Sequence, residues 1–154
     1  MCRKIFIVLV SFCSTLKINA QYPAGAIADS LKKDAKAVIR LEEEVFEIKS
    51  PGKATEHERH VYTILDEDEK DLARYQSEYD KFTSINNITA TLYDASGKEI
   101  KRVKKKDMSD ETGSDEETLM TDTRYKKCNL EYGIYPYTPA FQNRKGQLIH
   151  RELI

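Results

Sequence analysis

Cysteine is scarce in this sequence and tryptophan is absent: the 154 residues include three Cys and no Trp. Cys2 and Cys13 lie near the N-terminus, in a segment that we expect to be removed for the reasons given below. Cys128 would then be the single thiol of the mature chain, and one cysteine cannot form an internal disulfide. The fold must therefore depend on burial and on backbone hydrogen bonds, which a chain of this length can supply.

The sequence also lacks an apolar run of the roughly twenty residues that a membrane-spanning helix needs. Its most apolar stretch, residues 5–16, is shorter and stands between basic Arg3 and Lys4 and small Ala20. This order of charged, apolar and small residues is typical of a secretory signal peptide. We expect cleavage of residues 1–20 after Ala20, which leaves an exported protein, periplasmic or extracellular, without a transmembrane segment.

An excess of positive charge is missing as well. The chain has 25 Lys and Arg against 26 Asp and Glu, and loss of residues 1–20 removes three bases and no acid, so that 25 − 3 = 22 bases give a formal charge of −4. A dedicated nucleic-acid binder needs a concentrated basic face that displaces counterions. We therefore expect no nucleic-acid partner.

The sequence does contain many β-branched residues and nine Tyr, which favour pleated, half-buried strands. Turn signals at Ser50–Lys53 and Asp94–Lys98 separate short extended runs, without internal repeats. This pattern predicts a mainly β fold, an antiparallel β-sandwich-like domain with a short N-terminal helix from Ser30 to about Ala37. The expected strands are residues 38–48, 57–65, 85–93, 99–106 and 118–130.

Three of these stretches have features of their own. The apolar positions change parity between Val45 and Phe46, which predicts a bulge or a change of sheet at that point. Residues 72–82 have an apolar spacing that narrowly favours a helix and is also compatible with a strand. The strand expected at 99–106 is crowded with Lys and Arg, which is typical of an exposed edge strand.

Four segments carry a resemblance to a known family: AVIRLEEEVFEI at 37–48, RHVYTIL at 59–65, YDKFTSINNITATLYDASGKEIKRVKKKDMSD at 79–110 and YPYT at 135–138. Over about residues 26–138 the chain resembles the bacterial domain of unknown function 3857. The resemblance implies an extended conformation for residues 72–82 and an exported protein in which this domain directly precedes a transglutaminase-like domain. The shared motifs are strand and turn residues, and they imply no catalytic residue.

The resemblance stops soon after Tyr137, where the family continues with further strands and usually with a papain-like Cys-His-Asp domain. We expect a signal peptide at 1–20, a β-sandwich-like domain at 21–138 that is incomplete at its C-terminus, and a divergent tail at 139–154 without the next strand. Two explanations for the missing strands are open: a natural truncation and an interrupted reading frame. Missing strands would leave an open sheet edge.

Cys128 is the strongest candidate for a reactive residue. A nucleophilic Cys needs a neighbouring His that a third group orients. Only His150 follows Cys128, and no catalytic motif surrounds it. The flanking Lys126 and Lys127 could lower the pKa of the thiol, but a structural free thiol is favoured.

Metal binding is disfavoured at both clusters of ligand-type side chains. His57 and His60 are three residues apart and point to opposite faces of a strand. Residues 107–117 are acidic, but their spacing does not match the calcium-binding loop. We expect a solvated loop there, which in a weaker alternative folds against the basic residues 101–106. Its acidic residues are Asp107, Asp110, Glu111, Asp115, Glu116 and Glu117.

Two further patterns have an ordinary and a functional interpretation. Asn87 begins a glycosylation sequon, which we expect to be an ordinary strand segment. A cluster of tyrosines could line a sugar or peptide site, although packing in the core and in turns is the commoner role. These residues are Tyr125, Tyr132, Tyr135 and Tyr137.

The favoured function is a non-catalytic, exported binding or scaffold module, which takes a protein partner or a second copy of itself on an open sheet edge. One alternative is the remnant of a cysteine-dependent enzyme of the transglutaminase or protease type. The other is a non-functional truncated fragment. We expect no enzyme activity, no catalytic, metal-binding or cofactor-binding residues, and no cofactor.

Overall fold

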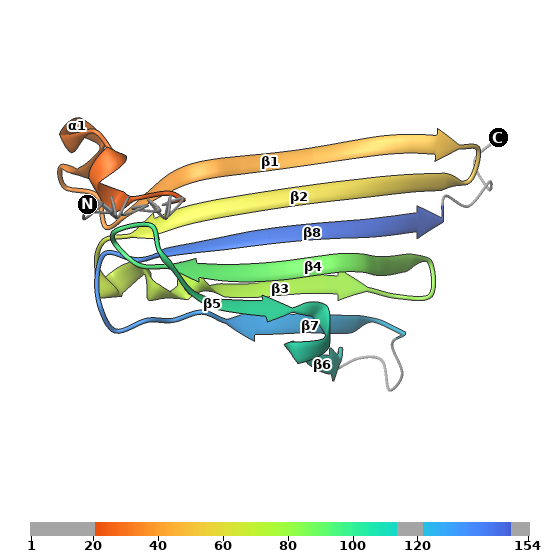
Figure 1. Cartoon of the computed structure of the whole chain (residues 1–154). Helices are drawn as coiled ribbons and strands as arrows, with labels where there is room; N and C mark the ends of the chain where they lie inside the picture. The colour runs from red at the N-terminus through yellow and green to blue at the C-terminus, as the bar shows by residue number, and fades with distance from the viewer. Residues whose placement is uncertain (1–20, 114–121, 149–154) are drawn as a thin grey trace, which may run out of the picture.

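The computed structural model describes residues 21–113 and 122–148, so the signal peptide expected at 1–20 lies outside the described part. Two antiparallel sheets dominate these ranges (Figure 1), which confirms the expected mainly β fold. The large sheet contains, in spatial order, β1 (Ala37–Ser50), β2 (Lys53–Ile64), β8 (Thr138–Leu148), β4 (Thr83–Tyr93) and β5 (Glu99–Lys104). The small sheet contains β3 (Arg74–Tyr79), β7 (Arg124–Asn129) and β6 (Ser109–Thr112).

The small sheet packs against one face of the large sheet, here called the inner face. The ring of Tyr75 on β3 stacks on Phe141 of β8, with centroids 4.9 Å apart. On β4 the buried apolar residues recur at every second position from Ile88 to Leu92, as expected for a strand with one face in the core. The core between the sheets consists of Ile64, Ala73, Ile85, Ile88, Ala90, Leu92, Val103, Met108, Leu130, Tyr137 and Phe141.

Residues 21–36 pack on the opposite face of the large sheet, here called the outer face. Ile27 is buried, and the hydroxyl of Tyr93 donates a hydrogen bond to Oε1 of Gln21 at 2.9 Å. The backbone N–H of Gln21 also donates to the carbonyl of Gly97 at 2.9 Å. The start of the described chain is therefore tied to the turn between β4 and β5.

Both expected hairpin turns are present, and each has a glycine with positive φ. Gly52 lies in the turn at Ser50–Lys53 with φ of +87°, and Gly97 lies in the turn at Asp94–Lys98 with φ of +84°. A Cβ on Gly97 would lie 2.8 Å from the carbonyl oxygen of Gln21. Glycine is therefore needed at Gly97 both for its backbone conformation and for the close approach of residues 21–36.

The N-terminal helix is shorter than expected. Helix α1 spans Asp29–Lys32 and follows Ala28, so Ser30 lies inside it and does not cap it. The helix cannot reach Ala37, because Asp34 has φ of +60° and β1 begins at Ala37. In the described part of the chain, no helix combines the length and the hydropathy required to cross a membrane.

The bulge expected between Val45 and Phe46 is wrong. The pairing of β1 with β2 is continuous through these residues, and it shifts instead between Ile39 and Leu41. Apolar side chains of both parities need no bulge here, because this half of β1 is exposed on both faces.

The extended conformation that the family resemblance implied for residues 72–82 is confirmed for β3 (74–79), whereas residues 72 and 73 end the 3₁₀ segment η2 (Glu67–Ala73) and residues 80–82 follow the strand. The charged strand expected at 99–106 is confirmed as an edge of the large sheet, where it forms β5. The solvated loop expected at 107–117 is wrong in its first half, which contains the end of η3 (Lys105–Asp107) and strand β6.

The tail expected at 139–154 is wrong where it overlaps β8, which lies between β2 and β4 in the middle of the large sheet. The hydrophobic pattern of the sequence did not predict this strand, because its inward side chains are partly polar. Asn143, Lys145 and Gln147 point to the inner face, where each donates a hydrogen bond to another side chain. Polar side chains can be buried when they are hydrogen-bonded, and a strand that buries them lacks the alternation of apolar and polar residues in its sequence.

Candidate functional site: the open edge of strand β1

Strand β1 is 14 residues long and forms one edge of the large sheet. It pairs with β2 along one side, and within the described ranges no strand pairs with its other side (Figure 1). The small sheet leaves β1 uncovered, because its nearest strand, β3, lies over β2 and β8, where Ser77 accepts a hydrogen bond from Asn143 at 2.8 Å. The free edge offers backbone N–H and C=O groups to a further strand.

Apolar side chains are exposed on both faces of β1. Phe46 and Ile48 lie on the inner face with 51% and 69% of their surface exposed, and Ile39 is exposed on the same face. Val45 is exposed on the outer face. Large apolar side chains gathered on one edge strand indicate an interaction surface.

The same strand is acidic. On its outer face, Glu43 pairs with Arg59 of β2 at 3.2 Å, which neutralises it. On its inner face, Glu42 and Glu44 have no ion-pair partner among the described residues. Glu44 lies directly opposite Glu58 of β2, whose charge Lys145 balances at 2.6 Å, so the negative charge on this side of the edge comes from Glu42 and Glu44.

A hollow of about 210 Å³ lies beside β1 on the inner face, where β2 meets β3 and η2. Its lining includes His60, Tyr62, Leu72 and Tyr75. The rings of His60 and Tyr62 stack with centroids 6.3 Å apart, and Nδ1 of His60 is buried with no hydrogen-bond partner in the described structure.

A charged cluster fixes β3 to the large sheet. Glu58 accepts hydrogen bonds from Lys145 at 2.6 Å, from the hydroxyl of Tyr75 at 2.8 Å and from Asn143 at 3.3 Å. Burial alone would raise the pKa of Glu58, but the hydrogen bonds from Lys145 and Tyr75 outweigh it and lower the pKa to about 2. The cluster is therefore a closed ion pair between the layers, with 15% of each of the two charged side chains exposed.

Glu56 shares this environment without the same compensation. Lys145 is 3.9 Å from Glu56, against 2.6 Å from Glu58. Burial raises the pKa of Glu56, and the neighbouring charges of Glu58 and Glu44 raise it further. A cation supplied beside β1 would therefore be favoured electrostatically.

Cys128 lies on β7 and is half-buried against the core. Burial raises the pKa of its thiol to about 11, which leaves little thiolate near neutral pH. Lys126 and Lys127, which could have lowered the pKa of the thiol, instead form ion pairs with acidic residues of β6. His150 lies outside the described residues.

The two histidines of β2 are separated by the sheet. His57 lies opposite Arg144 and lines an outer hollow, whereas the ring of His60 lies 6.5 Å from that of Tyr75 on the inner face. Nowhere in residues 21–113 and 122–148 do three His, Cys, Asp or Glu side chains come together as a metal site would require.

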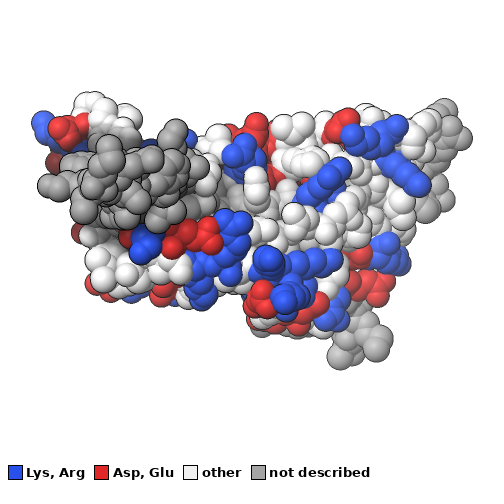
Figure 2. Space-filling view, in the orientation of Figure 1, with Lys and Arg blue, Asp and Glu red and all other residues white. Residues whose placement is uncertain are grey.

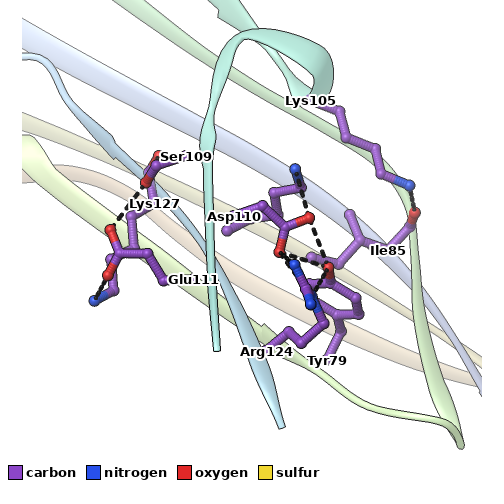
Figure 3. A network of polar contacts seen from close by, with 9 residues as sticks. Tyr79, Ile85, Lys105, Ser109, Asp110, Glu111, Arg124 and Lys127 are labelled. Atoms are coloured by element: carbon purple, nitrogen blue, oxygen red, sulfur yellow. Dashed lines mark hydrogen bonds and ion pairs between the residues drawn. The ribbon is translucent and has the colours of Figure 1, made fainter. Parts of the chain in front are cut away.

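Two residues of the expected acidic loop pair with β7 and not with residues 101–106, because β6 and β7 form adjacent strands of the small sheet. Asp110 accepts a hydrogen bond from the hydroxyl of Tyr79 at 2.7 Å, and it forms ion pairs with Arg124 and Lys126 (Figure 3). The bond from Tyr79 contributes most to lowering the pKa of Asp110 to about 2.

The other acidic residues of this segment make fewer contacts in the described structure than Asp110 does. Glu111 pairs with Lys127 at 2.6 Å, also on β7 (Figure 3). Asp107 lies in η3. Asp115, Glu116 and Glu117 lie outside the described residues, so cation binding by this segment stays untested.

The tyrosine cluster is mostly part of the core. The ring of Tyr137 is completely buried, with Tyr132 and Tyr135 at centroid distances of 6.0 and 5.3 Å. Tyr125 is separate from these three, on β7, where Lys127 lies over its ring. Asn87 is exposed on the outer face of β4, next to a shift in register.

Sequence reasoning missed the residues that β8 contributes, including Asn143 and Lys145, because no strand was expected there. One signal for the pairing exists in β2, where Glu56 and Glu58 alternate with His57 and Arg59. Such alternation of charge predicts an acidic face and a basic face for one strand.

The fold and its surface together define a two-sheet antiparallel domain in which β1 offers an exposed strand edge. The family model described as a domain of unknown function with a solved structure (DUF3857) matches residues 50–144, from the β1–β2 turn into β8. The chain belongs to this family. Searches of curated proteins and of solved structures gave no match.

Proposed function

We propose that this chain is an exported, non-catalytic binding module that accepts an extended segment of another polypeptide along β1. The exposed, unpaired edge of β1 is the observation that carries the proposal. A strand added there would gain a ladder of backbone hydrogen bonds, and its alternate side chains would contact the inner and outer faces of β1.

The chemistry of β1 selects the partner. Basic side chains would pair with Glu42 and Glu44, which are uncompensated among the described residues, and apolar side chains would cover Phe46 and Ile48. A partner segment in which Lys or Arg alternates with apolar residues satisfies both requirements. A second copy of β1 fits less well, because several of its acidic side chains would face each other.

The absence of catalysis in this proposal is supported by Cys128. A thiol whose pKa is raised to about 11 by burial is a poor nucleophile at neutral pH. The export in this proposal is supported by the order of charged, apolar and small residues at 1–20.

The test is a nuclear magnetic resonance titration of the protein with a short synthetic peptide of alternating lysine and valine. We expect shifts and slowed hydrogen exchange for backbone amides of β1, because the peptide completes its hydrogen-bond ladder. A peptide of alternating glutamate and valine should bind much more weakly.

A charge-reversal pair supplies the matched control. Glu44→Lys should abolish binding of the lysine peptide, whereas Glu78→Lys, the same change on edge strand β3, should leave it intact. Equal binding by both variants, shifts confined to another strand, or a stable dimer by light scattering in the absence of peptide would refute the proposed partner.

A further inference from the structure

The outer face of the large sheet is free of acid along its three central strands. On β2, Glu56 and Glu58 point inward, whereas His57 and Arg59 point outward. The outward side chains of β8 and β4 in the described ranges likewise include Arg144 and no Asp or Glu. Neighbouring β5 adds two cations, so the basic face consists of His57, Arg59, Arg102, Lys104 and Arg144.

In the described ranges, the acidic side chains of this face lie at its margins, on β1 and at the start of β5. Glu43 on β1 pairs with Arg59 at 3.2 Å, and Glu99 at the start of β5 pairs with Arg102 at 2.5 Å. Arg144 and Lys104 form no ion pair within 4.0 Å among the residues that the structure describes, although Glu47 on the outer side of β1 lies within electrostatic range of Arg144 and His57. Figure 2 shows this face, where Lys and Arg side chains stand among uncharged ones across the middle of the sheet.

Uncharged hydrogen-bonding side chains fill the space between the cations. Thr89 and Gln142 lie side by side on β4 and β8, and Asn87 lies beside Arg144. Two adjoining hollows, of about 230 and 250 Å³, open between these residues and the arginines. Hydroxyl and amide groups can donate and accept hydrogen bonds, so the face can recognise hydroxyls as well as anions.

The cations are too widely spaced to converge on one small anion. Arg59, Gln142, Thr89 and Lys104 lie in one row across four strands. Adjacent strands are about 4.8 Å apart, so the two cations at the ends of this row are separated by about 14 Å. A ligand that contacts both must be extended and must carry repeated negative charge.

We propose that the basic face binds an extended anionic polysaccharide, with its carboxylates on Arg59, Arg144 and Lys104 and its hydroxyls on Thr89 and Gln142. Nucleic acid fits less well, because binding of single strands depends on aromatic rings for base stacking, and the two tyrosine rings that line the first hollow, Tyr22 and Tyr93, pack against each other with centroids 5.9 Å apart. This site lies on a different surface from the β1 edge, so it stands independently of the proposed function.

The test is calorimetric titration of the purified protein with oligogalacturonate, a carboxylated oligosaccharide, and with a neutral maltooligosaccharide of equal length. We expect binding of the carboxylated probe alone, weakening as salt is raised. Arg144→Ala and Lys104→Ala should each reduce affinity by about fivefold, as expected for one exposed ionic contact. Lys127→Ala makes the same charge change on the small sheet and should have no effect.

Three results would overturn the proposal. The first is equal binding of the neutral oligosaccharide, which would remove the role of charge. The second is an equal loss of affinity in Lys127→Ala, which would show attraction by net charge alone. The third is equally tight binding of single-stranded DNA that depends on the same residues, which would assign the face to polyanions in general.

Discussion

Two carboxylates of β2 that are two residues apart, Glu56 and Glu58, have pKa values shifted in opposite directions. Glu58 has a pKa lowered from 4.5 to about 2, so its contribution to stability is present above pH 4.5 and is lost as pH falls toward 2. We expect Glu58→Gln to reduce the free energy of unfolding at pH 7 by about 1 to 2 kcal/mol, less than for a fully buried pair. Urea unfolding at pH 7, 4.5 and 3 should show a smaller acid-induced loss in the variant than in the wild type.

Glu56→Gln is the matched control for this prediction. The pKa of Glu56 is raised, so its ionised form opposes folding above its ordinary value of 4.5. A glutamine at this position can still accept the hydrogen bond from Gln147. We expect this variant to be as stable as the wild type or more stable at pH 7; equal losses in the two variants would contradict the assignment.

Cys128 provides a second prediction at the residue scale. Burial raises the pKa of the thiol from 9.0 to about 11, so the thiolate fraction at pH 8 should be about 100-fold lower than in the unfolded chain. Alkylation by iodoacetamide, followed by mass spectrometry, should therefore be much slower in buffer than in urea. Rapid alkylation of the folded protein at pH 8 would contradict this and would favour the enzyme alternative.

At the scale of elements, the turn between β4 and β5 secures the N-terminal segment. Gly97→Ala places a Cβ at positive φ and 2.8 Å from the carbonyl of Gln21, so we expect a loss of about 1 to 2 kcal/mol or more in stability. Gly133→Ala has no atom within 4 Å of the added Cβ and should change stability by less than about 0.5 kcal/mol. Thermal unfolding of both variants measures the difference, and a similar shift in both would show that the close contact is unimportant.

The sequence was most informative where a strand has one apolar face or ends in a glycine turn. β4, β5 and both hairpin turns could be predicted, because alternation and turn chemistry are local signals. β8 could not, because its inward residues Asn143 and Lys145 are paired with Ser77 and Glu58 from distant segments. The open edge was predicted for the wrong reason: it belongs to β1, whereas the region taken for a tail supplies a central strand.

Across the whole molecule, the large sheet extends beyond the small sheet that covers it. The small sheet covers part of its inner face, whereas β1 at its edge keeps apolar side chains exposed. Its outer face carries cations, whereas the inner side of β1 carries glutamates that form no ion pair with any described residue. These separate surfaces would attract ligands of opposite charge, so one protein molecule could bind both ligands at the same time.

This division predicts that stability and binding can be separated by two phenylalanine substitutions. Phe141 has 2% of its surface exposed and packs between the sheets, so Phe141→Ala should reduce the free energy of unfolding by about 3 to 5 kcal/mol. Phe46 lies on β1 with half of its surface exposed, so Phe46→Ala should reduce the free energy of unfolding by less than about 1 kcal/mol.

Binding of the lysine–valine peptide should follow the opposite order. Phe46→Ala removes an apolar contact from the free edge and should weaken binding, whereas Phe141→Ala, measured where it remains folded, should bind as the wild type does. Urea unfolding combined with the peptide titration measures both quantities. A large loss of stability in Phe46→Ala would mean that this side chain supports the fold. That result would contradict the proposal that the edge of β1 is a binding surface.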